Sequence, residues 1–239
     1  MTSDLQSAER VKTILWDFGG VFTGSPFYAL DGYAARLGVT SSEITESFLG
    51  YGIPDGNHPW HKLERGEITM EEATRLCARE VELAGIQGFD PRSFFNVIGG
   101  RADQADDGSS GFTIAGNNQA DEMFAGVKRL KAKGIQQIIV SNNIREFADT
   151  WRSMLPEELF DHIIDSSNVG VRKPDPAIFH LALEIAESTP ESTVFLDDYK
   201  EHVEIANSMG IHGIVVEKNP IEALTVLENL VKERNGNQS

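Results

Sequence analysis

Cysteine is nearly absent from this sequence, since Cys77 is the single one among 239 residues. One thiol cannot form an internal disulfide, which excludes a disulfide-stabilised secreted scaffold. Long apolar runs are also missing, and none approaches the roughly 20 residues that cross a bilayer. The first residues, MTSDLQSAERVK, lack the apolar stretch of a signal peptide. We therefore expect a soluble, cytoplasmic protein.

Basic residues are scarce as well. The chain has 21 lysines and arginines against 37 acidic residues, a formal net charge of −16. This charge repels phosphate backbones and anionic lipids, so nucleic acid and membrane surfaces are poor candidate partners. A small anionic substrate would need positive charge at its own site. The 40% hydrophobic content is ordinary for a globular chain with a buried core.

Five short apolar runs, rich in β-branched residues, predict buried parallel strands. These runs are KTILW (12–16), IQQIIV (135–140), HIID (162–165), TVFL (193–196) and HGIVV (212–216). Helical patterns lie between and after the later four, so strands and helices alternate through the second half of the chain. This alternation predicts an α/β fold with an open, doubly wound, Rossmann-like parallel sheet.

Start signals mark the helices of this second half. Asp175 and Asn219 each precede a proline, the arrangement of an N-cap residue with proline at the first helical position. Apolar residues at helical spacing follow both starts and also precede the second strand. They are Ile178, Leu181, Ala182 and Ile185, then Leu224, Leu227 and Val231, and before the second strand Met123, Val127 and Leu130.

The segment between the first two strands is helical in pattern. Its signals are the apolar face Phe27, Leu30, Ala34 and Leu37 ended by Gly38, the capping-box pairs Thr40 with Glu43 and Thr69 with Glu72, and the start Asp90-Pro91. We therefore expect a core of residues 1–23 and 101–239 and a helical insert of residues 24–100. Residues 99–119, rich in glycine, aspartate and serine, are expected to form an exposed loop.

Polar residues follow four of the predicted strands, and the carboxyl ends of parallel strands converge on one ligand-binding edge. They are Asp17, then Ser141, Asn142 and Asn143, then Arg172 and Lys173, and finally Asp197 and Asp198. The set combines a carboxylate nucleophile, hydroxyl and amide donors, a cation, and a carboxylate pair able to hold a hard divalent metal. It suits phosphoryl transfer, with attack by Asp17, charge neutralisation by Mg²⁺, and phosphate contacts from Ser141 and Lys173.

Four segments of the sequence resemble, in order, the motifs of the haloacid dehalogenase superfamily. They are WDFGGV, IIVSNN, VGVRKPDPAIF and VFLDDYKEHVEIANSMGI. The resemblance implies that Asp17 is nucleophile and metal ligand, that Ser141 donates to the phosphate, and that Lys173 steadies both. It also implies that Asp198 binds Mg²⁺ with Asp197 beside it. Asn142 is a further substrate-binding candidate.

The insert occupies the position of the helical cap found in many members of this superfamily. Within it, HPWHKLERGEIT (58–69) is similar to the cap of the branch that includes the phosphatase domain of soluble epoxide hydrolase. The resemblance therefore implies that a helical cap closes over the site.

The first motif departs from the family pattern at Gly19. Phosphatases of this superfamily usually carry there a second aspartate, which protonates the leaving oxygen and later activates water. Such a group is worth about 10² to 10⁴ in rate. We expect either a preference for leaving groups that need little protonation, such as acyl and aryl phosphates, or a cap residue that acts as the acid. The candidates for that acid are His58, His61 and Asp55.

Gly19 can still serve the metal through its backbone carbonyl. A D-x-G-G/N-V variant occurs in a similar branch, some of whose members look like active sugar-phosphate phosphatases. The loss of the second aspartate therefore does not by itself predict an inert protein.

Other interpretations stay open for single residues. Asp197 and Asp198 also suit the N-cap of a helix, and Ser141 suits the cap of a helix that starts near Ile144. The aromatic residues Phe27, Tyr51 and Trp60 are candidates for lining a substrate pocket, but packing in the core of the insert is expected instead.

The leading prediction is a hydrolase, specifically a magnesium-dependent phosphatase of a small phosphorylated molecule. One alternative is a 2-haloacid dehalogenase-like hydrolase, in which Asp17 attacks carbon. The Asp197-Asp198 pair disfavours this alternative, because that chemistry needs no metal. The other alternative is a binding or regulatory protein that kept the fold but lost turnover together with the second aspartate.

Overall fold

A five-stranded parallel sheet forms the centre of the computed structural model, which describes residues 9–54, 56–98 and 117–236. The strands lie in the order β3-β2-β1-β4-β5. Their bounds are β1 Thr13–Trp16, β2 Gln136–Ser141, β3 His162–Asp165, β4 Thr193–Asp197 and β5 His212–Val215. Each overlaps one of the five apolar runs, so the predicted strands and the parallel sheet are confirmed.

The central strand, β1, decides where the polar residues meet. Its side chains are all buried, because the sheet is covered on both faces. Trp16 pairs with Ile139 of β2 on one side and with Leu196 of β4 on the other. The three strands therefore end close together, and the residues that follow them emerge at one edge of the sheet.

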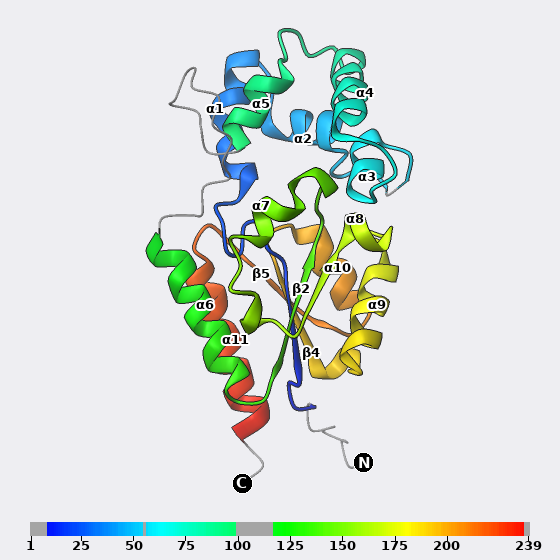
Figure 1. Cartoon of the computed structure of the whole chain (residues 1–239). Coiled ribbons are helices and arrows are strands. Elements are labelled where there is room, and N and C mark those ends of the chain that lie inside the picture. Colours follow the sequence, from blue (N-terminus) through cyan, green and yellow to red (C-terminus); the bar gives the residue numbers. More distant parts are fainter. Residues whose placement is uncertain (1–8, 55, 99–116, 237–239) are drawn as a thin grey trace, which may run out of the picture.

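Helices cover both faces of the sheet, as the doubly wound fold requires (Figure 1). One face packs against α6 (Asn117–Lys131), α7 (Ala148–Arg152) and α11 (Pro220–Gly236). The other face packs against α9 (Pro176–Ala186) and α10 (Lys200–Ser208). Short turns complete this part of the chain, namely η1 (Arg145–Phe147), η2 (Glu157–Leu159), α8 (Ser166–Val169) and η3 (Pro190–Ser192).

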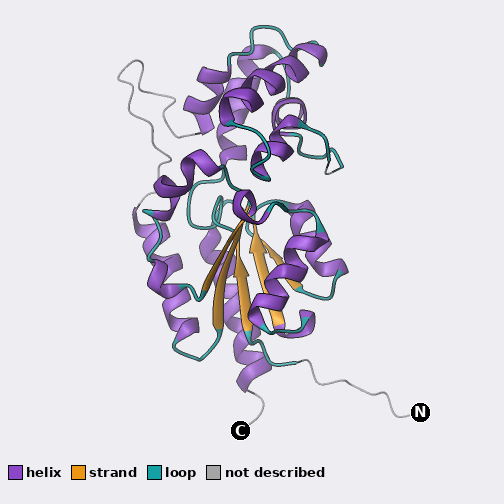
Figure 2. Cartoon of the chain, turned by 45° about the vertical axis from the view of Figure 1, so that its right-hand side comes forward, coloured by secondary structure: helices purple, strands orange, loops and turns teal. Residues whose placement is uncertain are grey.

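A separate helical layer lies over the carboxyl edge of the sheet, and the arrowheads of the strands point toward it (Figure 2). Its helices are α1 (Pro26–Leu37), α2 (Ser41–Leu49), α3 (Pro59–Glu64), α4 (Met70–Leu83) and α5 (Pro91–Ile98). We call these helices and their connections the insert. An apolar cluster that includes Leu30, Phe48, Trp60 and Phe94 holds it together, so the insert has a core of its own.

The predicted helix signals act as caps in the structure. Thr40 and Glu43 form a complete capping box, and Gly38 ends α1 in the left-handed conformation, with φ of 73°. Asp175 accepts the backbone N–H of Ala177 at 2.8 Å, and Asn219 accepts that of Ile221 at 3.2 Å. Local chemistry therefore sets these helix boundaries.

The predicted loop of residues 99–119 is corrected at its end, because α6 already begins at Asn117. Residues 99–116 of that loop lie outside the described residues. The division into a core of residues 1–23 and 101–239 and a cap of residues 24–100 stays our interpretation. Within the described ranges, no helix has the length and apolarity needed to cross a membrane.

Candidate active site

Asp17 and Lys173 form the centre of the candidate site. Asp17 directly follows β1, and its backbone N–H donates to the Leu196 carbonyl at 2.8 Å. The Lys173 ammonium lies 2.8 Å from Asp17 Oδ1 and 2.6 Å from Asp197 Oδ2. Only 1% of Lys173 is exposed, so both contacts are screened little by solvent. The structure thus brings together three residues that sequence analysis placed at separate strand ends.

Asn142 holds the backbone of Lys173 from both sides. Its side-chain oxygen accepts the Lys173 N–H at 2.8 Å, and its side-chain nitrogen donates to the Lys173 carbonyl at 2.9 Å. Asn142 was predicted as a substrate-binding residue, but its amide is engaged in fixing the lysine. The neighbouring Ser141 ends β2, is buried, and sits at the same edge. Ser141 does not cap a helix, because the N-cap residue of η1 is Ile144.

Asp197 is surrounded by donors. Its Oδ1 accepts the N–H of Tyr199 at 2.7 Å, while Oδ2 binds Lys173 and lies 3.1 Å from His202 Nδ1. Burial raises the pKa of Asp197, but Lys173 and His202 outweigh burial and hold that pKa at about 2. Asp197 is therefore not the N-cap residue of α10, which is Tyr199, but it binds the backbone there and the Lys173 ammonium. Its role at a metal stays a prediction.

Asp198 and Asp17 have fewer positive neighbours and hydrogen-bond donors than Asp197. Asp198 Oδ2 is buried and has no hydrogen-bond partner among the described residues. Burial, followed by the charges of Asp197 and Asp17, raises the pKa of Asp198 well above its ordinary value. Burial also raises the pKa of Asp17 to about 7, although Lys173 opposes it. Three carboxylates thus share one lysine, which leaves the cluster short of positive charge.

This cluster has the composition of a cation site. Asp17, Asp197 and Asp198 each offer an oxygen, and these oxygens lie within 4.8 Å of one another. Carboxylate oxygens are the ligands that hard divalent cations such as Mg²⁺ prefer. The buried oxygen of Asp198 that lacks a partner among the described residues is the observation that fits a bound cation best.

The two glycines after Asp17 differ in their surroundings. A methyl group at Gly19 would meet no described atom within 4 Å, so there is room where the family usually carries an aspartate. A methyl group at Gly20 would overlap the carboxylate of Asp198, and the φ of 72° at Gly20 also favours glycine. Gly20 therefore lets the first loop approach Asp198 closely.

A buried ion pair joins the insert to the sheet edge. Arg172, adjacent to Lys173, lies with its Nε 2.6 Å from Glu64 Oε2 of α3. Only 1% of Arg172 and 4% of Glu64 are exposed. Trp60 donates to the other oxygen of Glu64 at 3.0 Å, and Ser166 Oγ donates to the Glu64 carbonyl at 2.6 Å. The end of α3 is therefore fixed on the loop that carries Lys173.

The two histidines proposed as acids have contacts within the insert. His58 Nδ1 accepts the N–H of Trp60 at 3.2 Å, and its Nε2 lies 3.2 Å from the Ser47 carbonyl. His61 is buried, with Nε2 2.9 Å from the Gly50 carbonyl. Asp55, the third candidate, lies outside the described residues. The structure thus gives both imidazoles a task in holding the fold of the insert.

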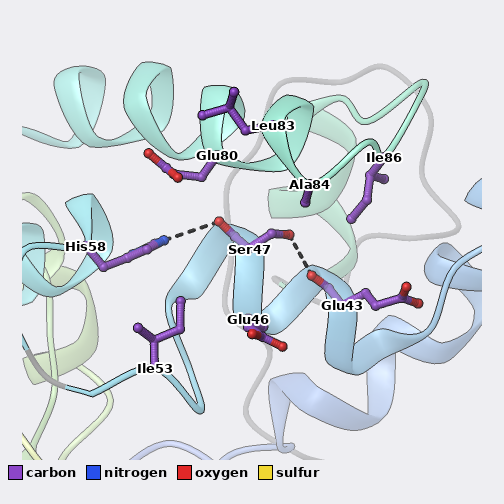
Figure 3. Close-up of a pocket in the computed structure, with 9 residues that line it drawn as sticks. All are labelled: Glu43, Glu46, Ser47, Ile53, His58, Glu80, Leu83, Ala84 and Ile86. Carbon is purple, nitrogen blue, oxygen red and sulfur yellow. Dashed lines mark hydrogen bonds between the residues drawn. The ribbon is translucent and has the colours of Figure 1, made fainter.

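The insert also contains a pocket of about 330 Å³, shown in Figure 3. Its lining residues come from α2, α4 and the neighbouring loops, and they are Glu43, Glu46, Ser47, Ile53, His58, Glu80, Leu83, Ala84 and Ile86. Three glutamates in this lining repel a phosphate group. The pocket is therefore unsuited to the anionic end of a phosphorylated substrate.

Three contributors to the site were missed in the sequence. Glu64 and His202 sit inside quoted motifs, but no role was assigned to them, and for Tyr51 packing was preferred over lining a pocket. In the structure the ring of Tyr51 contacts that of Tyr199, with centroids 4.7 Å apart. The signal in the sequence was the pair of glycines on either side of Tyr51, which marks a tight turn.

Several known proteins are similar to this chain. Acyl-CoA dehydrogenase family member 10 of Mus musculus is 30% identical over 226 residues, covering 92% of this chain and 19% of that protein. Bifunctional epoxide hydrolase 2 of Sus scrofa is 28% identical over 225 residues, covering 85% of this chain and 38% of that protein. This chain thus spans less than half the length of either relative.

Two further matches are closer to this chain in length. A sesquiterpene phosphatase of Aspergillus oryzae is 24% identical and covers 85% of this chain and 88% of its own. A solved HAD family enzyme of Bacteroides thetaiotaomicron, in complex with magnesium and inorganic phosphate, has a TM-score of 0.51 and 20% identity, covering 86% of this chain and 93% of its own. That structure shows the likeness of the fold.

The match to a family model covers most of the chain and includes all of the residues brought together at the sheet edge. The model describes haloacid dehalogenase-like hydrolases and spans residues 11–210. The similarity to bifunctional epoxide hydrolase 2 agrees with the resemblance to the branch that includes soluble epoxide hydrolase. The chain belongs to the haloacid dehalogenase-like hydrolase family.

Proposed function

We propose that this chain is a magnesium-dependent phosphatase of a small phosphorylated molecule and works through an aspartyl-phosphate on Asp17. The observation that carries the proposal is the cluster of Asp17, Asp197 and Asp198 around the single ammonium of Lys173. The match to a sesquiterpene phosphatase and the fold shared with an enzyme that binds magnesium and phosphate support it.

Asp17 and Asp198 are the proposed carboxylate ligands of Mg²⁺, and Gly19 is the proposed carbonyl ligand. Asp197 belongs to the same cluster, but its oxygens already accept from Tyr199 and Lys173. We therefore assign Asp197 mainly to holding Lys173 in place. When bound, the cation supplies neutralisation of the charge on the phosphoryl oxygens.

The chain's own residues carry the two covalent steps. A carboxylate oxygen of Asp17 attacks phosphorus, and the bond from phosphorus to the leaving oxygen breaks. Water then attacks the same phosphorus and frees Asp17. Lys173 orients Asp17 and binds a phosphoryl oxygen, with its backbone held by Asn142. Ser141 Oγ is the proposed donor to a second phosphoryl oxygen.

Phosphatase activity is tested by a screen of phosphorylated metabolites, aryl phosphates and acyl phosphates with Mg²⁺. Asp17→Asn is run beside the wild type, and Asp149→Asn, an exposed aspartate on α7, is the matched control. We expect the wild type to release phosphate only with Mg²⁺. Asp17→Asn should lower the rate by at least about 10³-fold, and the control variant should keep the wild-type rate.

The same screen separates the alternatives. Halide release from 2-haloacids that persists in a chelator would replace the phosphatase proposal with the dehalogenase one. If no phosphate ester turns over and Asp17→Asn behaves like the wild type, a binding or regulatory role replaces both.

A further inference from the structure

The proposed phosphatase has room for a proton donor at Gly19 but no side chain there. An alkoxide leaving group needs a proton as its bond to phosphorus breaks. His58 and His61 are bound to backbone groups of the insert. A further candidate for the donor lies on the turn that follows α2.

The turn after α2 presents one side chain toward the core. Gly50 and Gly52, on either side of Tyr51, both have left-handed backbones, with φ of 68° and 77°. His61 binds the Gly50 carbonyl at 2.9 Å, and a methyl group at Gly50 would overlap the rings of His61 and His58. The histidines thus fix the turn that carries Tyr51.

The ring of Tyr51 packs on residues that follow the metal-site carboxylates. It meets the Tyr199 ring edge-on, at 4.7 Å and an interplanar angle of 74°, and its centroid lies 6.2 Å from that of His202. Tyr199 directly follows Asp198, and His202 binds Asp197. The insert therefore places Tyr51 beside the end of β4.

The surroundings of the Tyr51 hydroxyl keep it protonated. Burial raises its pKa well above the ordinary value, and the charge of Glu64 adds to this effect, while Arg172 opposes it. The carboxylates of Asp17 and Asp198 raise the same pKa further. The hydroxyl is therefore protonated at neutral pH.

The ion pair of Glu64 with Arg172 fixes the position of the insert on the sheet edge. It joins α3 to the loop of Lys173 at 2.6 Å, in a place closed to solvent. The turn of Tyr51 is in turn bound to α3 through His61. The turn of Tyr51 and the loop of Lys173 are thus both bound to α3.

We propose that Tyr51 is the proton donor to the leaving oxygen, in place of the aspartate that Gly19 lacks. The inference rests on the proposed phosphatase function. As Asp17 bonds to phosphorus, the electron pair of the breaking bond goes to the leaving oxygen, which takes the proton of the Tyr51 hydroxyl. The tyrosinate then takes a proton from the water that attacks the phosphorus.

A donor of this kind selects among substrates. A hydroxyl with a raised pKa gives its proton readily only to a more basic oxygen, such as an alkoxide. A nitrophenolate leaves without help. Tyr51 should therefore matter for alkyl phosphates and contribute little to activated aryl phosphates.

Tyr51→Phe removes the hydroxyl and keeps the ring that packs on Tyr199. The probes are ethyl phosphate, phenyl phosphate and 4-nitrophenyl phosphate with Mg²⁺. We expect kcat for ethyl phosphate to fall by about 10² or more and kcat for 4-nitrophenyl phosphate to change by less than about 3-fold. Adding Gly19→Asp to Tyr51→Phe should restore ethyl phosphate hydrolysis, because a Cβ at Gly19 meets no described atom within 4 Å and the new carboxyl group supplies a proton.

The matched control is Tyr33→Phe, which removes a hydroxyl bonded to Asp90 inside the insert, away from the sheet edge. It should leave the dependence on leaving group unchanged. Two results would overturn the role of Tyr51 and leave the phosphatase proposal intact. One is an equal loss of kcat on all three esters in Tyr51→Phe. The other is a wild type that hydrolyses aryl but not alkyl phosphates. If Asp17→Asn matches the wild type on every ester, both proposals fall.

Discussion

The sheet edge and the insert above it both bury charged side chains, but they balance the charge differently. At the sheet edge, Asp17, Asp197 and Asp198 share one buried lysine, and Asp198 keeps an oxygen without a partner among the described residues. At the junction with the insert, Glu64 and Arg172 neutralise each other one to one.

The difference separates a binding site from a structural contact. A cluster short of positive charge gains free energy when a cation arrives, whereas a matched pair gains nothing from a ligand. The unbalanced region is thus suited to chemistry, and the balanced one to fixing the insert. Four sets of variants test this division.

Lys173→Met should have the largest effect, because it removes the cation of the unbalanced region. We expect turnover to fall by about 10² to 10³-fold. Urea unfolding of the metal-free protein should lose about 3–5 kcal/mol, part of which Mg²⁺ restores. Lys131→Met, which breaks the exposed contact with Asp161, should lose less than about 1 kcal/mol. Similar losses in both variants would contradict the division.

Glu64→Leu and Arg172→Met each leave one buried charge without its partner. Each single variant should lose about 3–5 kcal/mol of unfolding free energy, whereas the double variant should lose less than either. Glu204→Gln in the exposed pair with Lys200 is the control, with an expected loss below about 0.5 kcal/mol. Additive losses in the double variant would show that the two charges are not coupled.

Asp17→Asn should stabilise the metal-free protein at high pH. The folded pKa of about 7 lies above the ordinary 3.8, so ionising Asp17 opposes folding. This loss of folding free energy is fully present above pH 7, shrinks as the pH falls through 7, and is absent near pH 4. We expect Tm in chelator to rise by about 3 to 8 °C at pH 8 and to match the wild type at pH 4. A lower Tm at pH 8 would mean that Lys173 outweighs burial.

Gly19→Ala and Gly20→Ala should have the smallest effects on stability, and the two variants should differ clearly from each other. Gly19→Ala should change the unfolding free energy by less than about 0.5 kcal/mol, because its methyl group has room. Gly20→Ala should lose about 1–2 kcal/mol from backbone strain alone and should also weaken Mg²⁺ binding, since the methyl group displaces Asp198. Calorimetry of both variants with and without Mg²⁺ is the measurement.

The sheet edge was predictable because it follows from periodicity. Asp17 and Asp197 stand at the ends of apolar runs, and parallel strands bring such ends together wherever they lie in the sequence. The helix boundaries at Asp175 and Asn219 were predictable for a similar reason, because capping is local chemistry.

The contacts of the insert were not predictable in the same way. Whether Glu64 meets Arg172 depends on how two segments 108 residues apart are docked. The amide of Asn142 can bind a ligand or the backbone of Lys173, and the choice depends on a distance of a few ångströms. Tyr51 looked like a packing residue because an aromatic side chain in a helical segment is usually one.

The central position of β1 also has a consequence for folding. During synthesis β1 is made first, yet its two neighbours begin only at Gln136 and Thr193. Until β4 is made, one side of an apolar strand stays open to wrong pairing. The insert, which has its own apolar core, can fold meanwhile. A fragment that ends before Thr193 should therefore aggregate, because β1 lacks its β4 neighbour in that fragment.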